Sequence, residues 1–390
     1  MSIDIAAVRA QTPACTSLIH FNNAGAALSP QGVTAALIAH LELEQQIGAY
    51  EAAVVAAPAV EDFYGALAQM LGCSTREIAY AENATQAWNS LVNAIDFAPG
   101  ERIITGQSEY ASNYLTFLHL AKRQGVRIEV IPNDSAGLLD LERLEAAITA
   151  DVKLIALTHV PSQCGVIHPA AEVGRIAKKH GILYLLDACQ SAGQMALDVG
   201  ALGCDMLTGT GRKYLRGPRG TGFLYLNKDC KARLEPAAID LHAAQWLSAH
   251  SYRLREDARR FEHWECFVAG KIGLGRAVRY ALEIGLPAIE TRVQQLAHSL
   301  REQLAEIAGV TLYEHGAHLS GIVTFTTERM AAAQLHAILQ EQAVNSSVTK
   351  LSNSQLDLAT RAPGDVNRAS VHYYNTEEEV LRFCELLRQL

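Results

Sequence analysis

The chain has 390 residues, of which 49% are hydrophobic, and its formal net charge is -8 at pH 7. This length and apolar content are enough for one large and one smaller globular domain. The negative charge and the lack of any basic block argue against binding to nucleic acid, so we expect a small-molecule substrate.

The eight cysteines are scattered along the chain without a CxxC pair. This spacing predicts neither a disulfide framework nor a zinc site, and it favours a reducing compartment. The chain does not open on a charged start followed by an apolar core, and no run of about 20 apolar residues occurs. We therefore expect a cytoplasmic protein with no membrane partner, and we predict no metal.

Short apolar runs alternate with amphipathic stretches between about residues 75 and 226. The amphipathic stretches have apolar residues three or four positions apart, whereas the short runs are apolar nearly throughout, as buried parallel strands are. The pattern predicts an α/β fold with a mostly parallel sheet covered by helices on both faces. In chain order we expect strands over 102–106, 127–133, 154–160, 182–188, 205–211 and 220–226, with helices over 114–125, 141–150 and 170–181.

The hydrophobic pattern changes after about residue 235. Long helical patterns cover 271–285 and 289–309, and strand candidates follow at 310–315, 321–327 and 368–374. No repeat or flexible linker stands out, so we expect two domains that pack against each other. The large domain is predicted over residues 20–250, and the smaller α/β domain is built from residues 1–19 and 251–390.

Polar residues follow the predicted buried strands. In open α/β sheets, ligands bind beyond the carboxyl ends of the strands. Those ends carry Ser162, Asp187 and Thr210, and the segment TGTGRK then places Lys213 close to buried sheet. Two interpretations of this lysine are open: a neutral amine that forms a Schiff base, or a phosphate-binding lysine in a glycine-rich loop.

Asp187 ends an apolar strand, and a buried carboxylate needs a cationic partner or generous hydrogen bonding. A protonated pyridine nitrogen would meet that need; the alternative is that Asp187 caps the next helix. Pyridoxal phosphate has an aldehyde for a lysine, a ring nitrogen for a carboxylate, and a phosphate for hydroxyls and a helix N-terminus. One cofactor would therefore explain all of these features.

Seven segments carry a resemblance that spans nearly the whole chain. In order they are FNNAGAALSP, ENATQAWN, SEYASN, THVPSQCG, DACQS, TGTGRK and NRASVHYYNTEEEV. Together they resemble the class V aminotransferase group of fold-type I pyridoxal phosphate (PLP) enzymes, which contains cysteine desulfurases, selenocysteine lyases, C-S lyases and isopenicillin N epimerase-like proteins. The resemblance implies a large domain with a seven-stranded type of sheet, a smaller α/β C-terminal domain, pyridoxal 5'-phosphate as cofactor, and a homodimer.

The resemblance also implies roles for individual residues. Lys213 resembles the Schiff-base lysine that moves the substrate Cα proton. Asp187 matches the aspartate that pairs with the ring nitrogen, Gln190 matches the glutamine that contacts the ring oxygen, and Tyr110 replaces a histidine against the ring face. The other cofactor-binding candidates are Ala84, Thr85 and Gln86 at a helix start, Thr210 and Arg212 around the phosphate, and Ser162.

Arg368 matches the family arginine whose forked guanidinium grips the α-carboxylate of the substrate. Gly25 and Asn113 are further substrate-binding candidates. Glu265 falls where the family often has a threonine that reaches the partner subunit's phosphate. Because a carboxylate would repel a phosphate, we leave Glu265 out of the site.

Desulfurases need a cysteine thiolate on a loop in the last part of the chain. The corresponding stretch, VNSSVTKLSNSQLDLATRAPGDVN, contains no cysteine, and Cys384 lies in a terminal helical pattern. Elimination at Cβ needs only the lysine, the cofactor and a leaving group. We therefore expect a PLP-dependent C-S lyase that acts on a cysteine-derived amino acid (cystine, an S-conjugate or a sulfoxide) and releases pyruvate and ammonia.

The main alternative reaction is transamination to a keto acid. Further alternatives, ranked below transamination, are the reactions of a selenocysteine lyase, a cysteine desulfurase-like enzyme or an epimerase. The joint presence of Lys213, Asp187, Gln190 and Arg368 argues against a protein that binds the cofactor without turnover.

Overall fold

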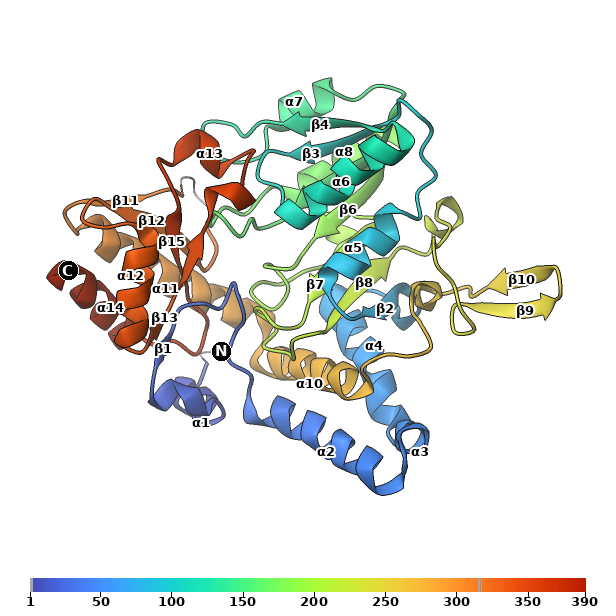
Figure 1. Cartoon of the computed structure of the whole chain (residues 1–390), viewed down its shortest axis with the longest axis horizontal. Coiled ribbons are helices and arrows are strands. Elements are labelled where there is room, and N and C mark those ends of the chain that lie inside the picture. Colours follow the sequence, from blue (N-terminus) through green and yellow to red (C-terminus); the bar gives the residue numbers. More distant parts are fainter. Residues whose placement is uncertain (1–2, 315, 317) are drawn as a thin grey trace.

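The computed structural model describes residues 3–314, 316 and 318–390. Its main feature is a seven-stranded sheet in the order β2-β8-β7-β6-β5-β3-β4 (Figure 1). Its strands from β3 to β7 run parallel, which confirms the predicted fold class, whereas β8 runs antiparallel to both of its neighbours. The strands are β2 (Ile78–Ala81), β3 (Arg102–Gly106), β4 (Arg127–Ile131), β5 (Val152–Thr158), β6 (Leu183–Asp187), β7 (Met206–Thr210) and β8 (Gly222–Leu226).

Helices cover both faces of this sheet. Successive side chains of a strand point to opposite faces, so Leu183 and Leu185 of β6 enter one core while Tyr184 and Leu186 enter the other. Both faces are therefore apolar, as the continuous apolar runs predict. One core includes residues of α4 (Ala57–Leu71), α7 (Leu141–Ala146), α8 (Ala170–His180) and α10 (Val268–Ile284), and the other includes residues of α5 (Ala84–Val92) and α6 (Ala111–Gln124).

Helix α8 illustrates how the sequence returns the chain to the sheet. Its last turn carries Lys178, Lys179 and His180. The positive charges of the two lysines interact favourably with the negative, C-terminal end of the helix dipole. Gly181 then adopts φ 66°, a left-handed conformation that ends the helix and that a side chain would strain. The chain enters β6 directly, so Asp187 reaches the far edge of the sheet.

A second, four-stranded antiparallel sheet has the order β11-β12-β15-β14. It shares a core with three helices and lies beside the large sheet (Figure 1). Its elements are β11 (Val310–Leu312), β12 (Ile322–Thr327), β14 (Ser347–Thr349) and β15 (Val366–Ser370), with α11 (Leu286–Ala305), α12 (Ala332–Glu341) and α14 (Glu377–Gln389).

The remaining elements connect these two units. A hairpin of β9 and β10 projects away from the body of the molecule (Figure 1), and the boundary predicted between residues 250 and 251 falls in its turn, so this division remains a prediction. In the described part of the chain, no helix is both long and apolar enough to cross a membrane. The connecting elements are α1 (Ile5–Ala10), β1 (Ile19–His20), α2 (Gln31–Ile47), α3 (Ala49–Val55), α9 (Val199–Leu202), β9 (Ala244–Ser248), β10 (Ser251–Leu254), β13 (Val344–Asn345) and α13 (Leu358–Arg361).

Candidate active site

Lys213 lies in a turn just beyond the carboxyl end of β7, and its side chain is buried. Burial lowers the pKa of its amine, and the nearby charges of Arg212 and Arg368 act in the same direction. Cys189 and Asp187 oppose that shift. A lysine with a lowered pKa is more readily neutral, which is the form that attacks a carbonyl or accepts a proton.

The turn that carries Lys213 is held by a buried arginine, Arg216, which the sequence analysis did not single out. Arg216 adopts φ 60°, and its backbone N–H donates to the carbonyl of Lys213 (2.8 Å). Its guanidinium donates to Thr12 Oγ1 (2.6 Å) and Tyr373 Oη (2.8 Å) and lies 4.4 Å from the ring centroid of Tyr374. Contacts from both ends of the chain therefore fix the position of Lys213.

Asp187 ends β6 and is buried at the same sheet edge. Its Oδ1 accepts the N–H of Cys189 (2.8 Å) and its Oδ2 accepts Asn113 Nδ2 (2.8 Å). No helix begins directly after it, so the helix-cap alternative does not describe this structure. Across the described residues, no lysine, arginine or histidine forms an ion pair with Asp187. A buried carboxylate without a cation suits a protonated ring nitrogen.

Gln190 and Tyr110 lie beside this pair. Gln190 Nε2 donates to the carbonyl of Ala24 (3.1 Å), while its buried Oε1 has no partner among the described residues. The ring centroid of Tyr110 is 5.7 Å from Lys213 Nζ. An aromatic plate and an unused polar atom thus accompany the lysine and the aspartate, as a flat, polar cofactor requires.

The predicted phosphate end lies where α5 begins, beside β7 and β8. A side chain at Gly222 would come within 3.0 Å of the Ala84 nitrogen, so this glycine allows the helix start to approach the sheet. Thr85 follows in the first turn, whereas the N–H of Gln86 donates to the N-cap Asn83 Oδ1 (2.8 Å). A helix N-terminus at a sheet edge favours an anion.

Two further phosphate candidates have partners of their own. Thr210 Oγ1 donates weakly to the carbonyl of Thr221 (3.4 Å), and the guanidinium of Arg212 donates to the carbonyl of Gly25. The hydrogen bond from Arg212 connects the lysine turn to the N-terminal FNNAGAALSP segment.

Arg368, on β15, reaches from the small sheet toward this edge. Its guanidinium donates to the carbonyl of Ser162 (3.1 Å) and to Asn22 Oδ1 (3.3 Å), and its buried Nε lacks a partner in the part of the chain described. Burial lowers its pKa to about 10 and the charge of Arg212 acts in the same direction, and no carboxylate among the described residues forms an ion pair with it. A side chain on Gly25 would come within 2.5 Å of Asn22 Oδ1, so the glycine leaves room for Asn22 to accept the hydrogen bond from Arg368. The arginine suits a carboxylate ligand.

Asn113, a predicted substrate contact, has its amide nitrogen engaged by two carboxylates, those of Asp187 (2.8 Å) and Glu109 (2.9 Å). The sequence analysis did not single out Glu109, although it precedes Tyr110 in the SEYASN segment. Glu265, set aside above, accepts a hydrogen bond from Tyr50 Oη (2.9 Å) on α3.

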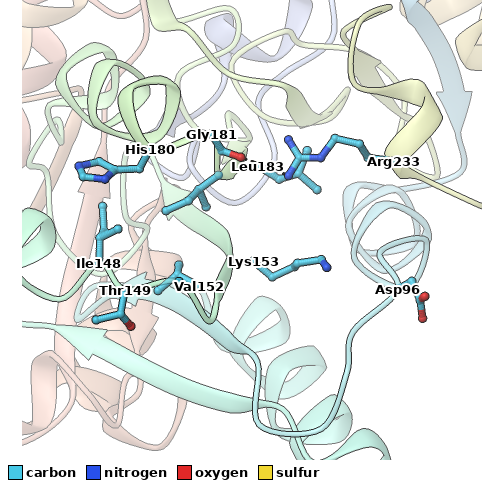
Figure 2. A pocket seen from close by; sticks show the side chains of 11 residues that line it. Asp96, Ile148, Thr149, Val152, Lys153, His180, Gly181, Leu183 and Arg233 are labelled. Atoms are coloured by element: carbon cyan, nitrogen blue, oxygen red, sulfur yellow. Dashed lines mark hydrogen bonds between the residues drawn. The ribbon is translucent and has the colours of Figure 1, made fainter.

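A separate hollow of about 680 Å³ lies at the opposite, amino edge of β5 and β6, and Figure 2 shows the side chains that line it. Lys153, His180 and Arg233 line it, and Lys153 Nζ already bonds Glu101 (3.1 Å). None of the predicted site residues lies there.

The sheet edge therefore combines a buried lysine, an uncompensated aspartate, an aromatic plate and a helix start. In an α/β chain of this topology, that set is what a fold-type I PLP enzyme requires, and the residues present fit the cofactor. The family Aminotransferase class-V matches residues 19–383. The chain belongs to the class V aminotransferase family, which confirms the predicted family and fold, and the predicted cofactor as that of the family.

Relatives within this family are similar over almost their whole length. A probable cysteine desulfurase of Methanothermobacter thermautotrophicus is 32% identical over 346 residues, which cover 88% of this chain and 86% of that protein. A probable cysteine desulfurase of Pyrococcus abyssi is 31% identical and covers 98% of this chain and 96% of its own.

Solved structures agree with this placement. The apo structure of a cysteine desulfurase from Thermococcus onnurineus has a TM-score of 0.91 at 30% identity and covers 100% of this chain and 98% of its own. A cystine C-S lyase in complex with its product, cysteine persulfide, has a TM-score of 0.87 at 22% identity and covers 97% of this chain and 100% of its own, which shows the shared fold.

Proposed function

We propose that this protein is a PLP-dependent C-S lyase that eliminates sulfur from a cysteine-derived amino acid and forms pyruvate and ammonia. The observation that carries the proposal is the buried set of Lys213, Asp187 and Arg368 at one sheet edge, combined with a C-terminal stretch that contains no cysteine. Residues 344–367, where desulfurases place that cysteine, run from β13 through β14 and α13 into the start of β15 and contain none.

Each step is assigned to a residue at the sheet edge. When bound, PLP supplies an electron sink for the substrate Cα. Arg368 holds the α-carboxylate, and its charge is close enough to act on the pKa of Lys213. Lys213 takes the Cα proton, and Asp187 balances positive charge at the ring nitrogen. Tyr110 covers the ring face and excludes water from it.

The overall reaction balances without an oxidant. The Cα proton leaves to Lys213, the Cβ–S bond breaks, and its electron pair leaves with sulfur, which then takes up a proton. The remaining three-carbon fragment adds water and releases pyruvate and ammonia.

Two cysteines could in principle replace the missing thiol. Cys384 is fully buried in α14, and burial raises its pKa to about 12. Cys189 lies beside Asp187 and Lys213, and burial raises its pKa well above the usual value. Both are therefore held as thiols, the weakly nucleophilic form.

The testing experiment incubates purified holoprotein with cystine or a cysteine sulfoxide, without any keto acid, and measures pyruvate. We expect pyruvate and ammonia in equal amounts, and Cys189→Ala and Cys384→Ala should keep the rate within about threefold because neither thiol accepts sulfur. An absolute requirement for a keto acid would establish transamination instead.

A cysteine desulfurase is the second candidate, because the relatives named above carry that name at 30–32% identity. This reaction would form alanine from cysteine and leave a persulfide on the protein. Alanine as the main product, abolished by Cys189→Ala, would favour it over the lyase.

We also propose a homodimer. Apolar side chains of α2, α3 and the segment before α10 line an exposed groove of about 1010 Å³, among them Leu41, Val54, Trp264 and Phe267. Val54 and Trp264 are 76% and 61% exposed. A contiguous apolar surface of this kind marks a protein interface, and we assign a second copy of this chain to it.

Trp264→Glu should convert the dimer to a monomer in light scattering, because a charge in a closed apolar interface is costly. Leu118→Glu is the matched control, since Leu118 is 46% exposed on α6, outside the groove. A monomeric wild type, or a Trp264→Glu protein that is still dimeric, would contradict the assignment.

A further inference from the structure

Glu109 is a buried carboxylate for which the mechanism above has no use. It lies between β3 and α6 and is 5% exposed. Its Oε1 accepts the N–H of Tyr110 (2.8 Å), Asn113 Nδ2 (2.9 Å) and the hydroxyl of Thr158, while its Oε2 accepts Thr105 Oγ1 (2.8 Å). Over the described residues, no lysine, arginine or histidine pairs with it. Four donors thus converge on one charge that has no counterion.

Asn113 connects this carboxylate to the candidate cofactor site. An amide nitrogen carries two hydrogens, and Asn113 donates one to Glu109 and the other to Asp187. The two carboxylates together fix which end of the amide faces Asp187, because its oxygen could not replace the nitrogen without repelling both. The bridge joins segments 74 residues apart in the chain.

Glu109 also holds the residue that covers the ring face. The N–H of Tyr110 donates to Glu109 Oε1 and, at 3.3 Å, to Thr158 Oγ1. The aromatic side chain therefore leaves from a backbone position that the same carboxylate fixes.

We propose that Glu109 is a positioning residue that acts through Asn113 on Asp187 and through the Tyr110 backbone on the aromatic plate. One carboxylate behind the site thereby sets two of the surfaces that hold the cofactor ring. The inference rests on the site described above and is independent of the reaction that the site performs.

The charge of Glu109 supplies a readout that a purely structural role would lack. The groups that face it are Thr105 of β3, Thr158 of β5, Asn113 of α6 and Asp187 of β6, of which Asp187 is the charged one. Burial, the largest cause, and the charge of Asp187 together raise the pKa of Glu109 to about 7, against the hydrogen bonds from Thr158, Asn113 and Thr105, which lower it. The carboxylate is ionised above about pH 7 and neutral below it, so its hold on Asn113 weakens as the pH falls.

The test uses holoenzyme and follows the visible absorption of the bound cofactor from about pH 5.5 to 9. In the wild type we expect an inflection near pH 7 that Glu109→Gln lacks, because the variant has no carboxyl group to titrate. The titration of the Schiff-base nitrogen itself is common to both proteins. At pH 8, Glu109→Gln should lower kcat about tenfold while KM stays within about twofold, since Arg368 is untouched.

Glu314→Gln is the matched control. Glu314 is also buried and accepts a threonine hydroxyl, Thr324 Oγ1 (2.7 Å), but it lies in the small domain, away from this network. Its variant should keep the inflection. A spectrum that responds equally to both substitutions, or a Glu109→Gln protein with the same inflections as the wild type, would overturn the proposal.

Thr158→Val keeps the test decisive if Glu109→Gln does not fold. Loss of one hydrogen bond to the ionised carboxylate should raise the inflection by roughly half to one pH unit. An inflection that stays at its wild-type pH would also overturn the proposal. Because these spectra require cofactor but no turnover, a failure of the lyase assay would not be mistaken for a failure here.

Discussion

Lys213→Ala is expected to remove the visible absorption of the lysine-bound cofactor, near about 410 to 430 nm, together with nearly all turnover. Lys213 is buried, its pKa is lowered by burial, and it lies near Asp187 and Tyr110. Without its amine, neither the covalent attachment nor the transfer of the Cα proton can occur. We expect kcat to fall by a factor on the order of 10³ or more.

Lys153→Ala provides the comparison, because Lys153 lies at the opposite edge of the sheet (Figure 2). That variant should keep both the absorption and the activity. A lysine-bound spectrum that persists in Lys213→Ala would show that another lysine holds the cofactor.

Arg368→Ala should chiefly raise KM for the amino acid. The substitution removes a forked contact to the α-carboxylate that is worth on the order of 2 to 4 kcal/mol, or roughly 30- to 1,000-fold. Arg368→Lys should recover only part of the loss, because an ammonium lacks the planar fork. Initial rates at varied substrate concentration measure both variants.

Arg361 distinguishes this prediction from a general loss of positive charge. It lies on α13, and its Nε bonds Asp357 Oδ1 at 2.7 Å, so its charge is already compensated. Arg361→Ala should therefore change KM much less than Arg368→Ala. The opposite order would assign carboxylate binding to Arg361.

The sequence predicted the parts of the site that follow from strand order. Asp187 and Lys213 follow neighbouring buried strands, and strands β6 and β7 do run parallel and adjacent. Their carboxyl ends must then meet at one edge, whatever the details of packing. The apolar runs did not show that β8 is antiparallel, because a buried strand reads the same in either direction.

Contacts between polar residues that lie far apart in the chain could not be predicted from the sequence. Nothing in the chain shows that Asn113 meets Asp187 rather than substrate, because the pairing depends on how α6 lies over the sheet. Arg216 stands among glycines and a proline and looks like an exposed loop residue, yet residues from both ends of the chain, Thr12 and Tyr373, help to bury it almost completely. Such residues become recognisable only when segments far apart in the sequence are seen in contact.

A crystal structure of the protein with pyridoxal 5'-phosphate bound would test the central claim most directly. The account predicts electron density continuous from Lys213 Nζ to the cofactor, with a carboxylate oxygen of Asp187 within hydrogen-bonding distance of the ring nitrogen. A cofactor joined to a different lysine, or a ring nitrogen that faces away from Asp187, would contradict it.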